Sequence, residues 1–426
     1  MRRRIPWQPA QNTETPLIER RTLKPKQLKI AIVGGGPAGL RAAELCAAAG
    51  AAVTVFDARR SVGRKLLVAG YGGLNLTHGE PLDAFVGRYT GGPGFPARLF
   101  EEMIRRFPPG ELRAWAAALG IETFEQRTGR VYPHEMKAAP LLRRWVERLR
   151  RQGVRFEVNA ALSELGPGPF LQHLNADERL HFDAIILALG GASWPRTGSD
   201  GSWLPLLVRH GIEITPFQPA NCGWEHPWPA ELVSRLEGQP LKNLRVHAGP
   251  LGVDGELMLT RYGLEGGAVY QLGPILRAMP EPALVVDLKP EVPEETLLRK
   301  MESVRRDFLD AAATRWKLGG PARLLLDHFH GPFHDVGTLA HAAKNLAIPL
   351  TGPRPIAEAI SSAGGVAWSE IDDTLMLHKL PGVFVAGEMI DWEAPTGGYL
   401  MQGCFATGTR TGRAAAEWVS HRRSVP

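Results

Sequence analysis

The stretch that decides the fold of this chain is Val33-Gly34-Gly35-Gly36-Pro37-Ala38-Gly39-Leu40. The apolar run before it, residues 28–33, is typical of a buried parallel strand. Residues 38–49 read as a helix that ends at Gly50. The sequence therefore predicts a strand, a glycine turn and a helix, which is the first unit of a dinucleotide-binding fold.

Each glycine of the turn has a separate task in such a unit. Gly34 permits the tight turn, Gly36 lets a pyrophosphate approach the backbone, and Gly39 lets the helix pack close to the strand. The first turn of the helix, with Pro37 and Ala38, supplies free N–H groups and a partial positive charge for phosphates. We expect all five residues to bind a cofactor.

A second predicted strand, residues 52–56, supports this interpretation because it ends at an acid, Asp57, followed by Ala58. A carboxylate at this place accepts hydrogen bonds from the ribose of adenosine. The glycine turn alone is also compatible with an ordinary loop between a strand and a helix. Strand, loop, helix, strand and acid together favour a bound dinucleotide, but they do not choose between FAD and NAD.

Length and composition allow two or three domains. The chain has 426 residues, of which 44% are hydrophobic and 22% charged, as in a globular protein with a substantial core. The formal net charge of +6 owes much to the first 30 residues. We expect residues 1–26 to form a basic, flexible extension, and a solvated tail is favoured over a contact for nucleic acid.

Several classes of protein are excluded by the sequence. It contains no run of 18 apolar residues, so we expect no membrane span. Its three cysteines form no CxxC motif, which favours a reducing, cytoplasmic location. Its 13 histidines form no HExxH motif or His/Cys cluster, so we expect no metal site.

The pattern of apolar residues, Pro and Gly changes twice along the chain. Residues 196–354 contain short alternating runs separated by Pro and Gly, and then helical patterns, which predict an inserted α+β domain on the substrate side. Buried-strand patterns flank it on both sides. We therefore expect an α/β fold in which residues 27–195 and 355–426 form a discontinuous, Rossmann-like domain.

The C-terminal block favours FAD over NAD. A predicted strand ends there in Gly387-Glu388, and Gly397-Gly398 precede a helix predicted from about Leu400 to Val419. FAD needs a second contact because its ribityl chain and flavin extend beyond the pyrophosphate. A helix N-terminus beside the flavin stabilises the negative charge gained on reduction.

Longer motifs in both halves resemble the BaiN/YhiN-type flavoproteins, a family that includes aminoacetone oxidases and bile-acid-type enone reductases. The motifs are Gly34–Gly39, Gly63–Leu67, Asn75–Thr77, Ala188–Pro195, Thr197–Gly201, Glu358–Val366 and Pro395–Tyr399. The resemblance implies bound FAD in a two-part domain. This sequence departs from the family pattern at Gly73-Leu74-Asn75, where many members have Arg-Cys-Asn. The departure indicates a divergent subfamily.

The resemblance also implies further cofactor contacts. We expect Arg64 and Lys65 to hold phosphate or ribose oxygens, although a solvated basic pair is the alternative. The remaining predicted contacts are Leu66, Gly73, Asn75, Leu76, Thr77, Ala188, Gly190, Gly191 and Tyr399.

Five side chains are candidates for catalysis. They are Tyr399, Asn75, Trp194, Arg261 and Tyr262. Tyr399 is expected to present a hydroxyl to the substrate, and Asn75 to reach the flavin edge. For Trp194, Arg261 and Tyr262, structural packing is an equally good interpretation.

The predicted function is hydride transfer between flavin N5 and a small organic substrate, either amine oxidation or enone reduction. The sequence has no second GxGxxG motif for NADPH. Electrons therefore come from the substrate, or from NAD(P)H that visits transiently. The alternative is a flavin-bearing RNA- or protein-binding module that uses the basic extension. The sequence predicts no oligomeric state.

Overall fold

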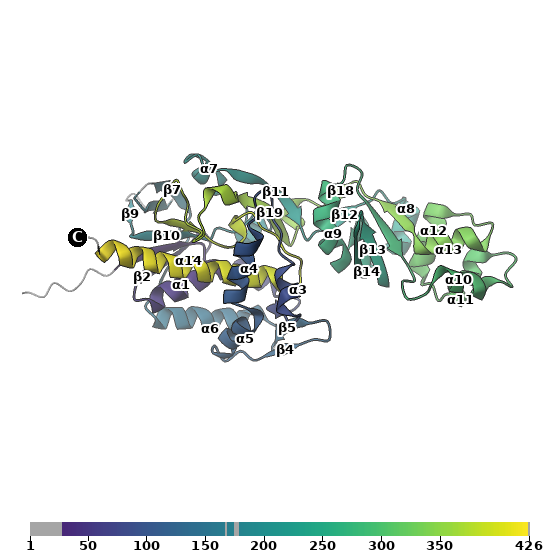
Figure 1. Ribbon diagram of the computed structural model, residues 1–426, viewed down its shortest axis with the longest axis horizontal. Helices are drawn as coiled ribbons and strands as arrows, with labels where there is room; N and C mark the ends of the chain where they lie inside the picture. Colours follow the sequence, from purple (N-terminus) through teal and green to yellow (C-terminus); the bar gives the residue numbers. More distant parts are fainter. Residues whose placement is uncertain (1–27, 167, 174–178, 425–426) are drawn as a thin grey trace, which may run out of the picture.

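The computed structural model describes residues 28–166, 168–173 and 179–424, which form two lobes (Figure 1). Each lobe has its own hydrophobic core. The first core draws on residues 30–212 and 366–419, and the second on residues 224–350. The predicted extension, residues 1–26, lies outside the described residues.

A five-stranded parallel sheet forms the centre of the first lobe. In spatial order its strands are β20 (Val383–Val385), β10 (Ala184–Leu187), β1 (Lys29–Val33), β2 (Ala52–Asp57) and β6 (Arg155–Val158). β10 is buried along its whole length and β1 along all but its first residue, because both faces of the sheet are covered. This confirms the predicted Rossmann-like α/β fold.

The two ends of the sequence meet on this sheet. Helix α1 (Pro37–Ala48) packs along α14 (Tyr399–Ser424), the long helix that crosses the first lobe in Figure 1. Their backbones come close together: a Cβ added to Gly408 would lie 2.4 Å from the Ala38 carbonyl oxygen. The Cys46 thiol donates a hydrogen bond to the Gly412 carbonyl oxygen at 3.3 Å.

Shorter elements complete the first lobe. Its helices are α2 (Arg64–Ala69), α3 (Leu82–Val86), α4 (Ala97–Arg106), α5 (Pro109–Ala117), α6 (Ala138–Arg151) and α7 (Leu204–Val208), with 3-10 turns η1 (Pro195–Thr197), η2 (Ile356–Glu358), η3 (Trp368–Glu370) and η4 (Gly387–Met389). One small sheet contains β3 (Thr77–His78), β4 (Thr123–Glu125) and β5 (Arg130–Pro133); another contains β7 (Leu162–Gly166), β8 (Phe170–His173) and β9 (Leu180–His181).

The second lobe is built on an antiparallel sheet of seven strands. Its strands are β17 (Leu346–Pro349), β16 (Ala283–Asp287), β13 (Pro240–Ala248), β14 (Leu251–Thr260), β15 (Gly263–Glu265), β12 (Trp224–Glu225) and β18 (Gly352–Pro353). Its helices are α8 (Ala230–Leu236), α9 (Gly267–Ala278), α10 (Glu294–Met301), α11 (Phe308–Arg315), α12 (Gly320–His330) and α13 (Val336–Lys344).

A two-stranded antiparallel pair leads into and out of the second lobe. It consists of β11 (Ile214–Ala220) and β19 (Ser361–Val366). The insert was expected to begin at residue 196, but Trp203, Leu207 and Ile212 pack in the first core. The second core begins only at residue 224, because the chain first forms α7, which packs in the first lobe against β7. The domain limits given above remain a prediction.

Three observations concern membrane spans, metal sites and cysteines, which the sequence analysis used to exclude classes of protein. Within the described ranges, no helix has both the length and the apolar content needed to cross a bilayer. The same part of the chain contains no group of three or more His, Cys, Asp or Glu side chains that could hold a metal ion. All three cysteines are buried thiols. The cellular location remains a prediction.

Candidate functional site

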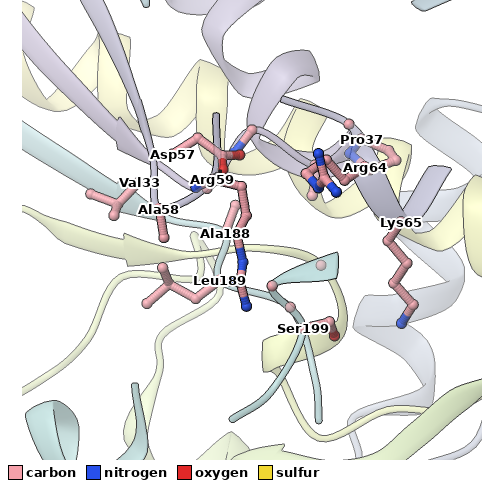
Figure 2. A pocket seen from close by; sticks show the side chains of 18 of the residues that line it. Val33, Pro37, Asp57, Ala58, Arg59, Arg64, Lys65, Ala188, Leu189 and Ser199 are labelled. Carbon is pink, nitrogen blue, oxygen red and sulfur yellow. Dashed lines mark hydrogen bonds between the residues drawn. The ribbon is translucent and has the colours of Figure 1, made fainter. Parts of the chain in front are cut away.

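A cleft lies at the carboxyl ends of β1, β2, β10 and β20 (Figure 2). We call it the cofactor cleft; it contains about 840 Å³ of empty space, including solvent at its open side. Ligands of open α/β sheets bind at this edge. The predicted cofactor residues that line it are Gly34, Gly36, Pro37, Ala38, Asp57, Ala58, Arg64, Lys65, Leu66, Ala188, Gly190, Gly387 and Glu388.

The three glycines of the opening motif have different surroundings. A Cβ on Gly34 would lie 2.1 Å from the Ala188 carbonyl oxygen, and one on Gly39 would lie 2.0 Å from the Gly34 carbonyl oxygen. A Cβ on Gly36 would have no atom within 4 Å. No side chain caps the N-terminus of α1. Gly34 and Gly39 are thus required by packing, whereas Gly36 leaves open space in front of a helix N-terminus, which suits a pyrophosphate.

Asp57 stands at the end of β2, where the acid was predicted. Its Oδ2 accepts a hydrogen bond from the Gly35 N–H at 3.0 Å, and its Oδ1 accepts one from the Arg59 N–H at 2.8 Å. Burial raises the pKa of this carboxyl group, and the two backbone hydrogen bonds oppose the rise. Each carboxylate oxygen keeps a lone pair that could accept from a ribose hydroxyl.

At the other end of the cofactor cleft, an ion pair joins segments far apart in the sequence. The Lys65 Nζ of α2 lies 2.7 Å from the Glu388 Oε2 of η4 and donates a second hydrogen bond to the Ser193 Oγ at 2.9 Å. Both charged side chains are largely buried. The Cys404 thiol of α14 also lines the cleft, and burial raises its pKa, so it remains a thiol.

Three polar atoms in the cofactor cleft have no partner among the described residues. They are the Arg59 Nε, the Arg64 Nε and the Ser199 Oγ, and all three are buried. In Figure 2, the Arg59 side chain extends from the Asp57 side of the cleft toward the loop that carries Ser199. There its guanidinium group donates to the Pro195 carbonyl oxygen at 2.9 Å.

Unpaired buried polar atoms are costly, so a ligand with several acceptors would stabilise this site. FAD, with its phosphates and hydroxyls, fits the open helix N-terminus and the unpaired donors. Arg59 and Ser199 were not predicted as contacts. The only signals in the sequence were the position of Arg59, two residues after Asp57, and the Thr197–Gly201 motif around Ser199.

Several predicted cofactor residues lie outside the cofactor cleft. Leu76 and Thr77 are completely buried, and a Cβ on Gly398 would lie 2.5 Å from the Thr77 Cα. The Thr77 hydroxyl donates to the Gln402 Oε1 at 2.8 Å, so this contact holds β3 against the first turn of α14. The other predicted residues that do not line the cleft are Gly39, Gly73, Asn75, Gly191, Gly397 and Tyr399.

Two of these residues face backbone or side-chain groups nearby. The Asn75 side-chain amide faces the carbonyl oxygens of Val131 and Thr77. A Cβ on Gly191 would lie 1.9 Å from the Ser362 Oγ, whose hydroxyl accepts from the Ala192 N–H. Asn75 and Gly191 thus lie against other protein groups, and their predicted contacts with FAD remain predictions.

A second hollow, the interlobe cavity, lies between the two lobes. It contains about 1,780 Å³ of empty space, open solvent included. From the first lobe it is lined by His78, Glu80, Arg88, Thr128, Arg130, Pro395, Thr396, Gly397 and Tyr399, and from the second by Lys242, Asn243, Leu244, Asp254, Gly255, Glu256, Gly267, Ala268, Gln271, Pro290 and Glu291. The first two turns of α14 border both hollows, with Tyr399 on the interlobe cavity and Cys404 on the cofactor cleft.

Tyr399 is held by a network of polar contacts. Its hydroxyl donates to the Glu80 Oε1 at 2.5 Å, and Arg88 donates to both Glu80 oxygens at 3.1 and 2.7 Å. Burial, and then the hydrogen bond and charge of Glu80, raise the pKa of Tyr399. Burial opposes the ionisation of Glu80, but the hydrogen bonds from Arg88 and Tyr399 outweigh it and lower the pKa of Glu80.

The other four catalytic candidates, Asn75 among them, line neither hollow. Trp194 is 37% exposed beside η1. Arg261 is exposed at the turn between β14 and β15. The Tyr262 hydroxyl donates to Glu265, and the Arg354 guanidinium lies 4.4 Å from the centre of its ring. The geometry therefore gives no support to the predicted catalytic role of Trp194, Arg261 and Tyr262.

Comparisons with known proteins agree with this architecture. Residues 28–414 match the family described as the HI0933-like protein Rossmann domain. The chain is 31% identical over 416 residues to the 3-dehydro-bile acid delta(4,6)-reductase of Clostridium scindens, covering 91% of this chain and 99% of the relative. It is 22% identical over 392 residues to the ribosomal RNA dihydrouridine synthase of Haemophilus influenzae, covering 87% and 94%.

Solved structures show the same fold at lower identity. The 3-ketosteroid-delta4-(5alpha)-dehydrogenase of Rhodococcus jostii RHA1 aligns with a TM-score of 0.50 and 15% identity, covering 93% of this chain and 98% of that chain. The protein is an FAD-dependent oxidoreductase, as its sequence predicted. The chain belongs to the family of HI0933-like proteins with a Rossmann domain.

Proposed function

We propose that this protein reduces a carbon–carbon double bond conjugated to a carbonyl group, in a small organic substrate held in the interlobe cavity. The names of two relatives support the reaction class. The double bonds of a 3-dehydro-bile acid with delta(4,6) unsaturation are conjugated to its oxo group. The ring double bond of uridine, which dihydrouridine lacks, is likewise conjugated to a ring carbonyl. Both reactions add two hydrogens to such a bond.

The cofactor cleft would hold FAD through the residues that face its open space. The N-terminus of α1 at Gly36 would bind the pyrophosphate, and Asp57 the ribose of adenosine. Arg64 and Lys65 would donate to phosphate or ribityl oxygens, and Glu388 would accept from a ribityl hydroxyl. When bound, FAD supplies the hydride donor and acceptor at its N5 atom.

NAD(P)H is the proposed source of electrons, as a transient visitor. The sequence contains one glycine-rich dinucleotide motif, at Gly34–Gly39, and the fold assigns this motif to the cofactor cleft. A nicotinamide would then use the open interlobe cavity in turn with the substrate. The Clostridium scindens relative is named a reductase, and any reductase needs a source of electrons.

One observation carries the proposal: the first two turns of α14 border both the cofactor cleft, at Cys404, and the interlobe cavity, at Tyr399. The test begins with the visible spectrum of the purified protein, followed by anaerobic mixing with NADPH or NADH. A steroid 4-en-3-one, a uridine-containing transcript and aminoacetone are then added separately. We expect the nicotinamide to bleach the flavin and an enone to restore its absorbance.

Two outcomes would contradict the proposal. A colourless protein that cannot be reconstituted with FAD would remove its basis. If aminoacetone bleaches the oxidised flavin with oxygen uptake, and no enone reoxidises the reduced form, the protein is an amine oxidase. Salt-sensitive retention of RNA that disappears on deletion of residues 1–26 would instead support the binding-module alternative.

A further inference from the structure

The Tyr399 side chain lies at the wall of the interlobe cavity and is fixed there by three neighbouring segments. Glu80 and Arg88, which flank α3, hold its hydroxyl group. His78 of β3 stacks on its ring, with centroids 5.3 Å apart. The Tyr89 hydroxyl donates to the Tyr399 carbonyl oxygen at 2.9 Å. Tyr399 is only 5% exposed, yet it lines the cavity.

We propose that Tyr399 is the acid that protonates the substrate, and that Glu80 and Arg88 are positioning residues that hold its hydroxyl at the cavity wall. This inference rests on the proposed function, because it assigns the proton of the same reduction. Neither Glu80 nor Arg88 was a candidate from the sequence. They lie 319 and 311 residues before Tyr399 in the chain, so no short motif joins them to it.

The proposed step balances as follows. When bound and reduced by NAD(P)H, FAD would supply the hydride for a new C–H bond at the β-carbon of the substrate, which would leave an enolate. The O–H bond of Tyr399 then breaks and a C–H bond forms at the α-carbon, which completes the two-electron reduction. The Tyr399 phenolate takes a proton from water in the open interlobe cavity.

Glu80 and Arg88 have opposite effects on this proton. The Glu80 carboxylate accepts the Tyr399 hydrogen bond and disfavours an adjacent phenolate, so the hydroxyl keeps its proton between turnovers. The Arg88 guanidinium favours the phenolate and offsets part of this effect. The remaining titratable neighbours are His78 and Tyr89. The His78 Nδ1 accepts from the Glu80 N–H at 3.1 Å, and its Nε2 lies 3.0 Å from the Thr128 carbonyl oxygen.

Tyr399 differs from the aromatic residues that pack against it, because it lines the interlobe cavity and they do not. Phe85 and Tyr89 pack against its ring, with centroids 4.7 and 6.4 Å away, and both are buried. Neither of them lines the interlobe cavity. A phenylalanine at position 399 would satisfy the same packing, so the hydroxyl group is the part of Tyr399 that packing does not require.

The test separates the two half-reactions by stopped-flow mixing of the holoenzyme. In Tyr399→Phe, we expect reoxidation by the enone to slow by about 100-fold or more. Reduction by NADPH, FAD content and the Kd of the enone from the flavin spectrum should stay within about 3-fold. An unchanged rate of reoxidation in Tyr399→Phe would overturn the inference.

The positioning role is tested by the pH profile of reoxidation. Glu80→Gln removes the charge that raises the pKa of Tyr399, so the alkaline limb should move to lower pH. Glu147→Gln is the matched control, because Glu147 pairs with Arg151 on the exposed face of α6. It should leave the profile unchanged. An identical profile in Glu80→Gln and the wild type would refute the assigned roles of Glu80 and Arg88.

Failure of the inference and failure of the proposed function give different results. If no enone reoxidises the wild-type enzyme, the reduction itself is refuted, and the inference with it. If an enone reoxidises both the wild type and Tyr399→Phe at the same rate, the reduction stands and only the proton assignment is refuted.

Discussion

The cofactor cleft and the interlobe cavity are built in different ways. Backbone shapes much of the cofactor cleft, through a glycine turn, a helix N-terminus and the ends of parallel strands. Side chains from both lobes shape much of the interlobe cavity, and its best-defined polar group, Tyr399 with Glu80 and Arg88, joins segments remote in sequence. Backbone geometry can be read from a short motif, whereas a cavity of distant side chains depends on the whole fold.

The largest effect is expected where backbone meets backbone in the cofactor cleft. The Cβ of Gly39→Ala would lie 2.0 Å from the Gly34 carbonyl oxygen, so the turn or α1 must shift. We expect a loss of about 1–3 kcal/mol in the free energy of unfolding, together with loss of FAD. Thermal unfolding and the ratio of flavin to protein absorbance measure both.

Gly110→Ala is the matched control for this prediction. Gly110 also lies in the first turn of a helix, α5, but a Cβ there would have no atom within 4 Å. It should leave FAD binding unchanged and alter stability by less than about 1 kcal/mol. If Gly39→Ala binds FAD as tightly as Gly110→Ala, close packing of α1 is not what the cleft requires.

Gly36→Ala distinguishes cofactor binding from folding. The added methyl group meets no protein atom, so the unfolding temperature of the apoprotein should not change. The methyl group would occupy space assigned to the pyrophosphate, so we expect the Kd for FAD to rise about 10-fold or more, a loss of at least about 1.4 kcal/mol. Fluorescence titration of the apoprotein with FAD measures this Kd. An unchanged Kd would show that the pyrophosphate does not bind at Gly36.

The ion pair across the cofactor cleft should have a smaller effect. Lys65→Met leaves the largely buried Glu388 without its partner, and we expect FAD affinity to fall about 5- to 10-fold. Lys379→Met is the control, because it breaks the 2.7 Å pair with the buried Glu370 away from the cleft. It should lower stability without changing the Kd for FAD. Equal affinities in the two variants would contradict a cofactor role for Lys65.

Ser199→Ala is expected to have the smallest effect. It removes one unpaired buried hydroxyl, so the apoprotein should not be destabilised. If FAD forms a hydrogen bond with this hydroxyl, the Kd of Ser199→Ala for FAD rises about 3-fold. This rise corresponds to one neutral hydrogen bond. Ser202→Ala, at an exposed position two residues beyond Asp200, should match the wild type in the same titration. A lower Kd in Ser199→Ala would show that the hydroxyl opposes binding.

The sequence predicted most of the parallel-sheet lobe because that lobe depends on local patterns. The glycine turn, Asp57 and the Gly387-Glu388 block all lie in the cofactor cleft, as expected. Arg59 and Ser199 were not predicted because their places in the cleft depend on how the loop after β10 folds. Leu76 and Thr77, which were predicted to contact FAD, are buried where β3 packs against α14, a contact that only the folded chain reveals.

The second lobe was harder to predict for a physical reason. Strand pairing in an antiparallel sheet decides which turns face the neighbouring lobe, and short alternating strands do not specify that pairing. The turn with Arg261 and Tyr262, which were candidates for catalysis, does not line the interlobe cavity, whereas residues of β13 and β14 do. The predicted boundary at residue 196 lies before the change of hydrophobic core for a related reason, since Trp203 and Leu207 pack in the first core.

The central claim is that the two hollows have separate roles: the cofactor cleft binds FAD, and the substrate is reduced in the interlobe cavity. The most direct test measures FAD affinity and the rate of reoxidation by an enone in both Gly36→Ala and Tyr399→Phe. We predict that Gly36→Ala weakens FAD affinity and, once saturated with FAD, reoxidises at nearly the wild-type rate. Tyr399→Phe should bind FAD normally and reoxidise slowly. Loss of FAD affinity in Tyr399→Phe, or normal reoxidation by it, would contradict the account.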